Sequence, residues 1–462
     1  MKNKWAALAL LAATQFVLIL DLTIVSIALP PLGRDLGLDQ QDLSWLTTAY
    51  SLVFGGLLLL GGRLSDFAGR RRVFMAGMVL FAAGSLVGGF ASTGEVLVAV
   101  RAVQGLAGAL VAPAAMSLVM TIFEGDPAFG KAMGIWGAVG GVGGAAGVVL
   151  GGLLTDWFGW RSVFFVNVPV GVVVAGLALV ILPAAGPAAV RKGFDLAGAV
   201  TSTAGLALLI YSLVDLDIRW TAVAVALLVV FVVIESRSAN PLLPLGIFRK
   251  KLLRAGNVLM FLVASAMQAV FFILTLYTQV VLGYSATQSG LSMAAIAVSI
   301  ALTASMLGGR SVARYGLRTT AGIGMGLIAV AVAWYTRIGV NGAFLADLLG
   351  PEIISGIGFG LLVVAATIAA TSEALPAEAG LASGLFNVTQ QVGISVGIAV
   401  LITVASTRTA GATDTASLVA GYQAAIWVGL GIIVAGVIAA LTLLPRKTAT
   451  KEPQQAAPVP TA

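Results

Sequence analysis

The chain has 462 residues, of which 59% are hydrophobic and only 10% are charged, and its mean hydropathy is +1.04. This composition excludes an ordinary soluble protein, and the absence of cysteine and histidine excludes disulfides, thiol chemistry and the usual zinc and haem sites, so we expect no metal and no cofactor. The formal net charge of +7 does not indicate nucleic-acid binding, because the basic residues lie at the ends of apolar runs, where membrane topology accounts for them.

Fourteen apolar runs follow one another along the chain, and each is about as long as a helix that crosses a bilayer. A strand-like alternation of hydropathy is absent, so the sequence predicts an all-α integral membrane protein rather than a membrane barrel. The runs lie at residues 5–29, 44–61, 73–91, 96–120, 133–154, 162–182, 195–214, 220–235, 256–282, 287–307, 319–336, 345–370, 381–405 and 421–444.

The distribution of positive charge predicts the orientation of these spans. If both termini are cytoplasmic, most lysines and arginines lie on the cytoplasmic side, and Arg101 lies within a span. We therefore expect a multi-pass protein of the cytoplasmic membrane with both termini inside the cell. The basic residues left outside are then Arg34, Arg161, Arg219, Arg337 and Arg408.

Asp21 lies inside the first run, which is too long for a cleavable signal and should remain as a helix. An ionisable group at that depth costs about 2.5–3.5 kcal/mol, so Asp21 should face a cavity or a partner. A carboxylate that is balanced between desolvation and a nearby cation can bind and release a proton. The alternative is a structural aspartate that hydrogen-bonds serine or threonine hydroxyls and never titrates.

The segment GRLSDFAGRRR at 62–72 separates the second and third runs and predicts a tight turn at the cytoplasmic surface. Its glycines permit positive φ and close helix approach, and its aspartate can accept hydrogen bonds that latch one helix end to another. We expect conformational gating by Gly62, Asp66, Gly69, Arg70 and Arg71.

The sequence LGGR at 60–63 recurs at 307–310, and both copies end a run on the same side, although Ala313 takes the place of Asp66. A repeat of this kind predicts two six-span halves with a substrate site between them near the midplane. We expect a first bundle at 1–185, two additional linking spans within 186–254, a second bundle at 255–445 and a disordered cytoplasmic tail at 446–462.

The fourth run carries RAVQG at 101–105, and Arg101 is the natural ionic partner for a buried carboxylate. At 1.5 Å rise per residue, Arg101 lies roughly 9 Å and Asp21 roughly 13 Å below the outer ends of their spans. The alternative is an arginine that snorkels to the outer interface. In the fifth run, Gly143, Gly147 and Gly151 share one helix face and permit close approach of a partner helix. We expect these three glycines to take part in conformational gating as well; the alternative is generic glycine packing.

Polar and aromatic residues within the spans could line a substrate cavity or serve only to join helices. The candidates are Gln15, Trp45, Tyr50, Phe54 and Gln104 in the first half, and Gln268, Tyr277, Gln279, Asn387, Gln390 and Gln391 in the second. Glu352 begins the twelfth span and is either a second site for a proton or cation, or an interfacial carboxylate at a helix N-terminus.

These segments resemble the signatures of the fourteen-span drug:proton antiporter family of the major facilitator superfamily. The resemblance rests on the loop at 62–72, on LDLTIVSIALP at 20–30, on RAVQG at 101–105, on GVVLGG at 147–152 and on WFGWRSVFFVNVP at 157–169, and it is looser in the second half. Val148 stands where the fifth-span motif has proline, and Gln390 stands where family members often have arginine.

The resemblance implies a major facilitator fold with two six-helix bundles and two linking helices, in which the first and fourth spans are neighbours. Asp21 and Arg101 would then interact and couple transport to protons, whereas Glu352 is a proton-coupling candidate from its position alone. The implied function is proton-coupled export of amphipathic or cationic drugs by alternating access, with a small-molecule substrate, protons and the lipid bilayer as partners, and with a monomeric protein.

Two other functions stay open at this stage. The chain could be a dedicated exporter of one metabolite, such as an antibiotic, an amino acid or a siderophore, or a membrane sensor that uses the same fold without transport. An ATP-driven pump is disfavoured because no GxxxxGK[ST] segment occurs, and an enzyme is disfavoured because histidine, cysteine and a convergent carboxylate pair are absent.

Overall fold

The computed structural model describes residues 4–124, 126–183, 195–215, 217–238, 241, 243, 245–373, 379–409, 411–412 and 414–446. The described part is helical and contains no strand, which confirms the predicted fold class. Of the predicted tail at 446–462, only Arg446 belongs to the described residues.

The helices of the first half are α1 (Lys4–Leu36), α2 (Gln40–Ala68), α3 (Arg70–Gly89), α4 (Gly94–Ile122), α5 (Phe129–Phe158), α6 (Ser162–Phe165) and α7 (Asn167–Ile181). The linking helices are α8 (Leu196–Asp215) and α9 (Ile218–Arg237), followed by the short η1 (Leu245–Arg249). The second half contains α10 (Lys251–Leu276), η2 (Tyr277–Val281), α11 (Ala286–Thr303), η3 (Ala304–Gly308), α12 (Gly309–Tyr335), η4 (Phe344–Leu348), α13 (Leu349–Ser372), α14 (Ala379–Thr409) and α15 (Thr415–Leu443).

Ten stretches of the described residues are long and apolar enough to cross a membrane, and one of them, Ala286–Tyr335, contains both α11 and α12. With α2, α5 and α8 they account for the 14 predicted spans. The sixth span is broken into α6 and α7, which the apolar pattern did not predict. The predicted domain boundaries stay a prediction, and α10 already crosses the one at 254/255.

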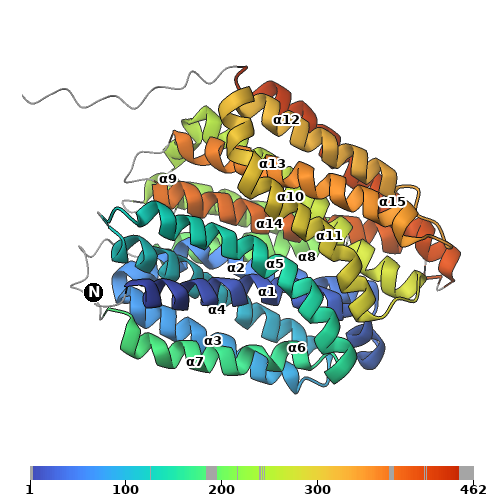
Figure 1. Ribbon diagram of the computed structural model, residues 1–462, viewed down its shortest axis with the longest axis horizontal. Helices are drawn as coiled ribbons and strands as arrows, with labels where there is room; N and C mark the ends of the chain where they lie inside the picture. The colour runs from blue at the N-terminus through green and yellow to red at the C-terminus, as the bar shows by residue number, and fades with distance from the viewer. Residues whose placement is uncertain are drawn as a thin grey trace, which may run out of the picture.

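The two halves lie side by side, as Figure 1 shows, with α1–α7 in blue to green and α10–α15 in yellow to red. In the first half, α1 packs against α5, and α4 packs against α2 and α3. In the second half, α10 packs against α14, and α12 packs against α13 and α15. The halves meet where α5 packs against α11 and α2 packs against α14.

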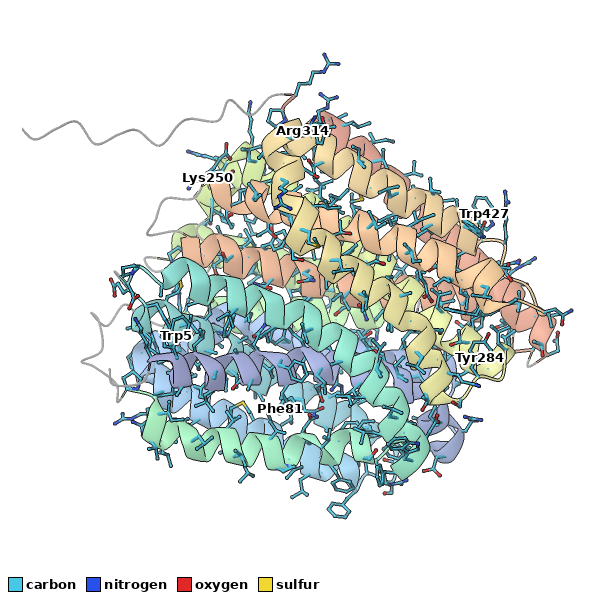
Figure 2. All side chains as sticks on the ribbon, viewed as in Figure 1. Trp5, Phe81, Lys250, Tyr284, Arg314 and Trp427 are labelled. Carbon is cyan, nitrogen blue, oxygen red and sulfur yellow. The ribbon has the colours of Figure 1, made fainter. Side chains whose placement is uncertain are left out.

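We call the end of the bundle at which α1 begins the terminal end, and the end at which α1 meets α2 the distal end. Figure 2 shows Trp5, Lys250 and Arg314 toward the terminal end and Tyr284 at the distal end. At the distal end, residues of the first half such as Ile24, Leu46 and Val148 belong to one apolar core with the second half.

A separate apolar cluster fills the terminal half of α1, α3, α4 and α7. It includes Leu11, Phe74, Phe123 and Leu182, and its buried members all come from the first half. Among the described residues, the halves therefore share a core at the distal end, whereas at the terminal end the first half packs on itself.

The linking helix α8 lies against both halves rather than against one. Thr203 on α8 is close to Gly56 on α2, where an added methyl group would lie 3.0 Å from its hydroxyl oxygen. The Tyr211 ring lies 6.2 Å from the Trp45 ring, and Leu206 packs on a small cluster of α2 and α14 residues. Of the extra pair of spans, α8 therefore covers the junction between α2 and α14.

The repeated loop motif folds in the same way in both halves. Gly69 has φ of 96° and Gly316, in the second copy, has φ of 82°, so both positions favour glycine. The expected close approach near Gly62 is made instead by its neighbour Gly61, where a methyl group would lie 3.3 Å from the Leu110 Cα atom; on Gly62 it would meet only Pro113, at 3.7 Å.

Candidate functional site

Asp21 and Arg101 form a buried ion pair between α1 and α4. The Arg101 Nη1 atom donates a hydrogen bond of 2.6 Å to Asp21 Oδ2. The Arg101 side chain is 1% exposed and the Asp21 side chain is 0% exposed. Arg101 Nη1 also donates to Gln104 Oε1 at 2.9 Å, and Arg101 Nε donates to the Leu46 carbonyl oxygen at 3.1 Å. Arg101 therefore does not snorkel, and the interaction expected from the depths of the two residues is present.

The second carboxylate oxygen of Asp21 is also occupied. Asn167 Nδ2 donates to Asp21 Oδ1 at 2.7 Å, and Gln104 Nε2 lies 3.5 Å from the same oxygen and donates to Ser85 Oγ at 2.9 Å. We call Asp21, Ser85, Arg101, Gln104 and Asn167 the Asp21 cluster. It joins α1, α3, α4 and α7, so that a change at the carboxylate alters the contacts among four helices of the first half.

The cluster also has an aromatic wall, because the Arg101 guanidinium lies 4.4 Å from the centre of the Tyr50 ring. Such a contact stabilises a desolvated cation. Phe54 stacks on Tyr50, with ring centres 5.8 Å apart. Tyr50 and Gln104 were expected to contact substrate, but the structure buries both within this cluster.

A buried ion pair of this kind is stable only while its polar atoms are satisfied, since each charge loses its hydration shell on burial. Here both carboxylate oxygens and the guanidinium have partners. Sequence analysis missed Ser85 and Asn167. The signal for Asn167 is a polar amide within the apolar segment at 162–182.

The three glycines on one face of α5 pack against α1, the helix that carries Asp21. A methyl group on Gly147 would lie 2.9 Å from the Leu20 carbonyl oxygen, one on Gly151 would lie 3.0 Å from that of Ile24, and one on Gly143 would lie 3.2 Å from that of Phe16. The three glycines therefore fix α1 beside α5 by close backbone approach. The predicted gating role of these glycines stays a prediction.

We expect Gly147→Ala to lower the free energy of unfolding by about 1–3 kcal/mol, because overpacking forces α1 away from α5. The control is Gly144→Ala on the same helix, where an added methyl group has no atom within 4 Å. That variant should be neutral or gain up to about 1 kcal/mol from helix propensity. Thermal unfolding of both variants in one detergent measures the difference, and equal melting temperatures would contradict the close packing.

The arginines of the loop at 62–72 donate to oxygen atoms near the terminal ends of other helices or in the segment that follows them. Arg71 donates to the Leu182 carbonyl oxygen at 3.2 Å, just after α7 ends. Arg70 donates to Thr121 Oγ1 near the end of α4, and Arg63 donates to the Pro241 carbonyl oxygen in the segment after α9. Cations at helix C-termini are stabilised by the free carbonyls there. The side chain of Asp66 lies outside the described part of the structure.

The predicted polar residues of the second half fall into two groups. Gln279 and Tyr277 are engaged: Gln279 Nε2 donates to the Ile27 carbonyl oxygen across the halves at 2.9 Å, and the Tyr277 hydroxyl donates to the Gly339 carbonyl oxygen at 2.7 Å. Asn387 is exposed and donates to Ser383 on its own helix. Residues that are at least half-buried and remain candidates for substrate contact are Gln15, Trp45, Phe54, Gln268, Gln390 and Gln391.

Glu352 lies in the first turn of α13 and is only 1% exposed. Its Oε2 atom has no hydrogen-bond partner among the described residues. An interfacial carboxylate would be solvated, whereas this one is enclosed in the second half, separate from the Asp21 cluster.

A family model described as Major Facilitator Superfamily matches residues 11–398. The chain belongs to this superfamily, and it is a multi-pass membrane transporter, as the sequence predicted.

Two curated relatives extend over nearly the whole chain. It is 34% identical to the puromycin resistance protein pur8 of Streptomyces alboniger, over 96% of this chain and 92% of that protein. It is 37% identical to the cephamycin export protein CmcT of Amycolatopsis lactamdurans, over 95% of this chain and 92% of that protein. These relatives are consistent with the fourteen-span family that the motifs resemble.

Solved structures share the fold at low identity. The crystal structure of a bacterial homolog of the human lysosomal transporter Spinster, inward-facing and occupied, matches with a TM-score of 0.72 at 14% identity, over 96% of this chain and 97% of that one. The nucleoside transporter NupG matches with a TM-score of 0.70 at 13% identity, over 96% of this chain and 100% of that one. At these identities the likeness concerns the fold alone.

Proposed function

We propose that this protein is a proton-coupled antiporter that exports amphipathic or cationic compounds across the cytoplasmic membrane by alternating access. The observation that carries the proposal is the Asp21–Arg101 pair, buried inside the first half with every carboxylate oxygen occupied. The names of the relatives, which include resistance and export proteins, support the direction of transport.

The chemistry of the pair follows from its burial. A proton that binds Asp21 cancels its charge, so the attraction to Arg101 is lost and Asn167 no longer faces an anion. The cluster then releases α1 relative to α4 and α7, and a different packing of the halves becomes accessible. Loss of the proton restores the pair, since Arg101 keeps its charge at every physiological pH.

We place the terminal end in the cytoplasm, because the basic loop at 62–72 lies there. The conformation described above is then closed toward the outside, and substrate would enter from the cytoplasm between the halves. Glu352 is proposed as a second proton or cation site, since it is enclosed and forms no ion pair with a residue that the structure describes. We further propose that the two bundles move as units within a monomer.

A dedicated exporter of one compound is the second candidate, because the names of both curated relatives refer to a single antibiotic. The experiment that separates the two is flux in proteoliposomes with an imposed pH gradient, with ethidium as the fluorescent cargo. Competition by several unrelated amphipathic cations, together with gradient-driven ethidium uptake, supports the broad exporter. No ethidium flux, combined with gradient-driven flux of one antibiotic class, supports the dedicated exporter. No flux of any of these compounds would contradict both and favour a sensor.

A further inference from the structure

The distal ends of α5 and α11 are joined by an aspartate that belongs to neither the Asp21 cluster nor the loop at 62–72. Asp156, in the last turn of α5, accepts a hydrogen bond from the backbone N–H of Ala286 through Oδ1 at 3.1 Å. Its Oδ2 atom accepts from the backbone N–H of Thr287 at 2.8 Å. Asp156 lies in the first half and α11 in the second, so both bonds cross between the halves.

The two N–H groups are those that a helix leaves free at its start. Ala286 and Thr287 are the first residues of α11, and the first N–H groups of a helix have no partner within it. Ser285 caps the N–H of Gln288 from within the second half. Asp156 satisfies the remaining pair from the first half, and its negative charge is favoured at a helix N-terminus.

The backbones beneath these bonds are in direct contact. A methyl group on Gly152 would lie 2.6 Å from both the Ala286 carbonyl oxygen and the Thr287 Cα atom, and one on Gly290 would collide with the Val148 carbonyl oxygen. The glycines let the backbones of α5 and α11 touch, and the Asp156 carboxylate bridges the ends of the two helices. Together these contacts close the distal side and fix the position of α5 along α11. Val148, the residue in place of the usual proline, lies within this contact.

We propose that Asp156 is the gating residue that holds the distal side closed, and that its bonds to Ala286 and Thr287 break each time the transporter opens outward. The inference rests on the proposed alternating access. Asp156 is itself exposed, so water can replace the backbone donors when the halves part. A carboxylate bound to two N–H groups is strong enough to select the closed state and weak enough to release it.

The test uses the absence of cysteine from the sequence. Ile27 is 0% exposed at the distal contact between the halves, so a single Ile27→Cys substitution reports opening through its reaction with a membrane-impermeant maleimide added from the outside. No substrate and no gradient are needed. We expect slow labelling with Asp156 present and labelling about tenfold faster with Asp156→Ala, because both cross-half bonds are lost. Asp156→Asn, which keeps the shape and one acceptor, should fall between them.

The matched control is Asp35→Ala in the same reporter background. Asp35 is also a distal carboxylate with two donors, but Trp160 Nε1 at 2.9 Å and Arg161 Nη1 at 2.8 Å both belong to its own half. Its loss should leave the labelling rate unchanged. Equal acceleration by Asp35→Ala and Asp156→Ala, or no acceleration by either Asp156 variant, would overturn the proposal.

The outcome is separable from the proposed function. Faster labelling in Asp156→Ala, in a protein that shows no gradient-driven flux, would keep the gate and reject proton-coupled export. Unchanged labelling in a protein that does transport would reject the gate alone. Melting temperatures of the Asp156 and Asp35 variants identify any general loss of folding, and only a difference between variants of equal stability supports the gate.

Discussion

We expect Asp21→Asn to reduce pH-gradient-driven ethidium accumulation in proteoliposomes to the level of protein-free vesicles. The amide has nearly the shape of the carboxylate, but it binds no proton at physiological pH and leaves Arg101 without a counter-charge. Its NH2 group replaces one of the two oxygens, so one of the two donors, Arg101 or Asn167, which lie 2.6 and 2.7 Å from the carboxylate oxygens, loses its acceptor. The coupling step should therefore be lost although the helices remain in place.

The control for that experiment is Asp35→Asn, a carboxylate near the end of the same helix whose partners are all in its own half. It should transport at nearly the wild-type rate. Wild-type transport by Asp21→Asn would show that Asp21 is structural. Glu352→Gln would then be the next variant to measure, since Glu352 is the enclosed carboxylate of the second half.

We expect Arg101→Ala to lower the free energy of unfolding by about 3–5 kcal/mol, because it leaves the Asp21 carboxylate buried without its cation. It also removes the donors to Gln104 and to the Leu46 carbonyl oxygen, together with the contact to Tyr50. Thermal unfolding in detergent measures the loss.

Two further variants test whether the destabilisation by Arg101→Ala comes from the unpaired Asp21 carboxylate. Arg219→Ala, at an exposed position at the start of α9, should leave the free energy of unfolding within about 0.5 kcal/mol of the wild type. Adding Asp21→Asn to Arg101→Ala should recover part of the lost stability, because the uncompensated charge disappears. A double variant that loses the sum of both single effects would contradict a direct pairing.

The linking helix α8 makes contacts with both halves that the sequence did not predict. Hydropathy identified two extra spans, but it contained no indication that α8 would cover the junction of α2 and α14. The Thr203–Gly56 and Tyr211–Trp45 contacts show that α8 packs on α2. This helix lies at the junction of the two halves, which must change if the halves move relative to each other.

The sequence by itself determined the number and nature of the spans, and it identified Asp21 and Arg101 as the ionisable pair that the structure brings together. The physical reason is that a bilayer requires long apolar helices with internally satisfied backbones, so that any ionisable residue within one is conspicuous. The glycine stripe was visible for the same reason, since its spacing is set by the helix alone.

Only the tertiary structure decided which groups complete these features. Asn167, Ser85 and the Leu46 carbonyl oxygen join the Asp21 cluster because of how four helices are rotated and inclined, which no local pattern records. Asp156 was not singled out from the sequence. Its partners include backbone N–H groups, which every residue other than proline possesses and which therefore leave no mark in a sequence. Which hydrogen-bond partners two distant segments offer each other depends on how the helices pack, and only the tertiary structure gives that packing.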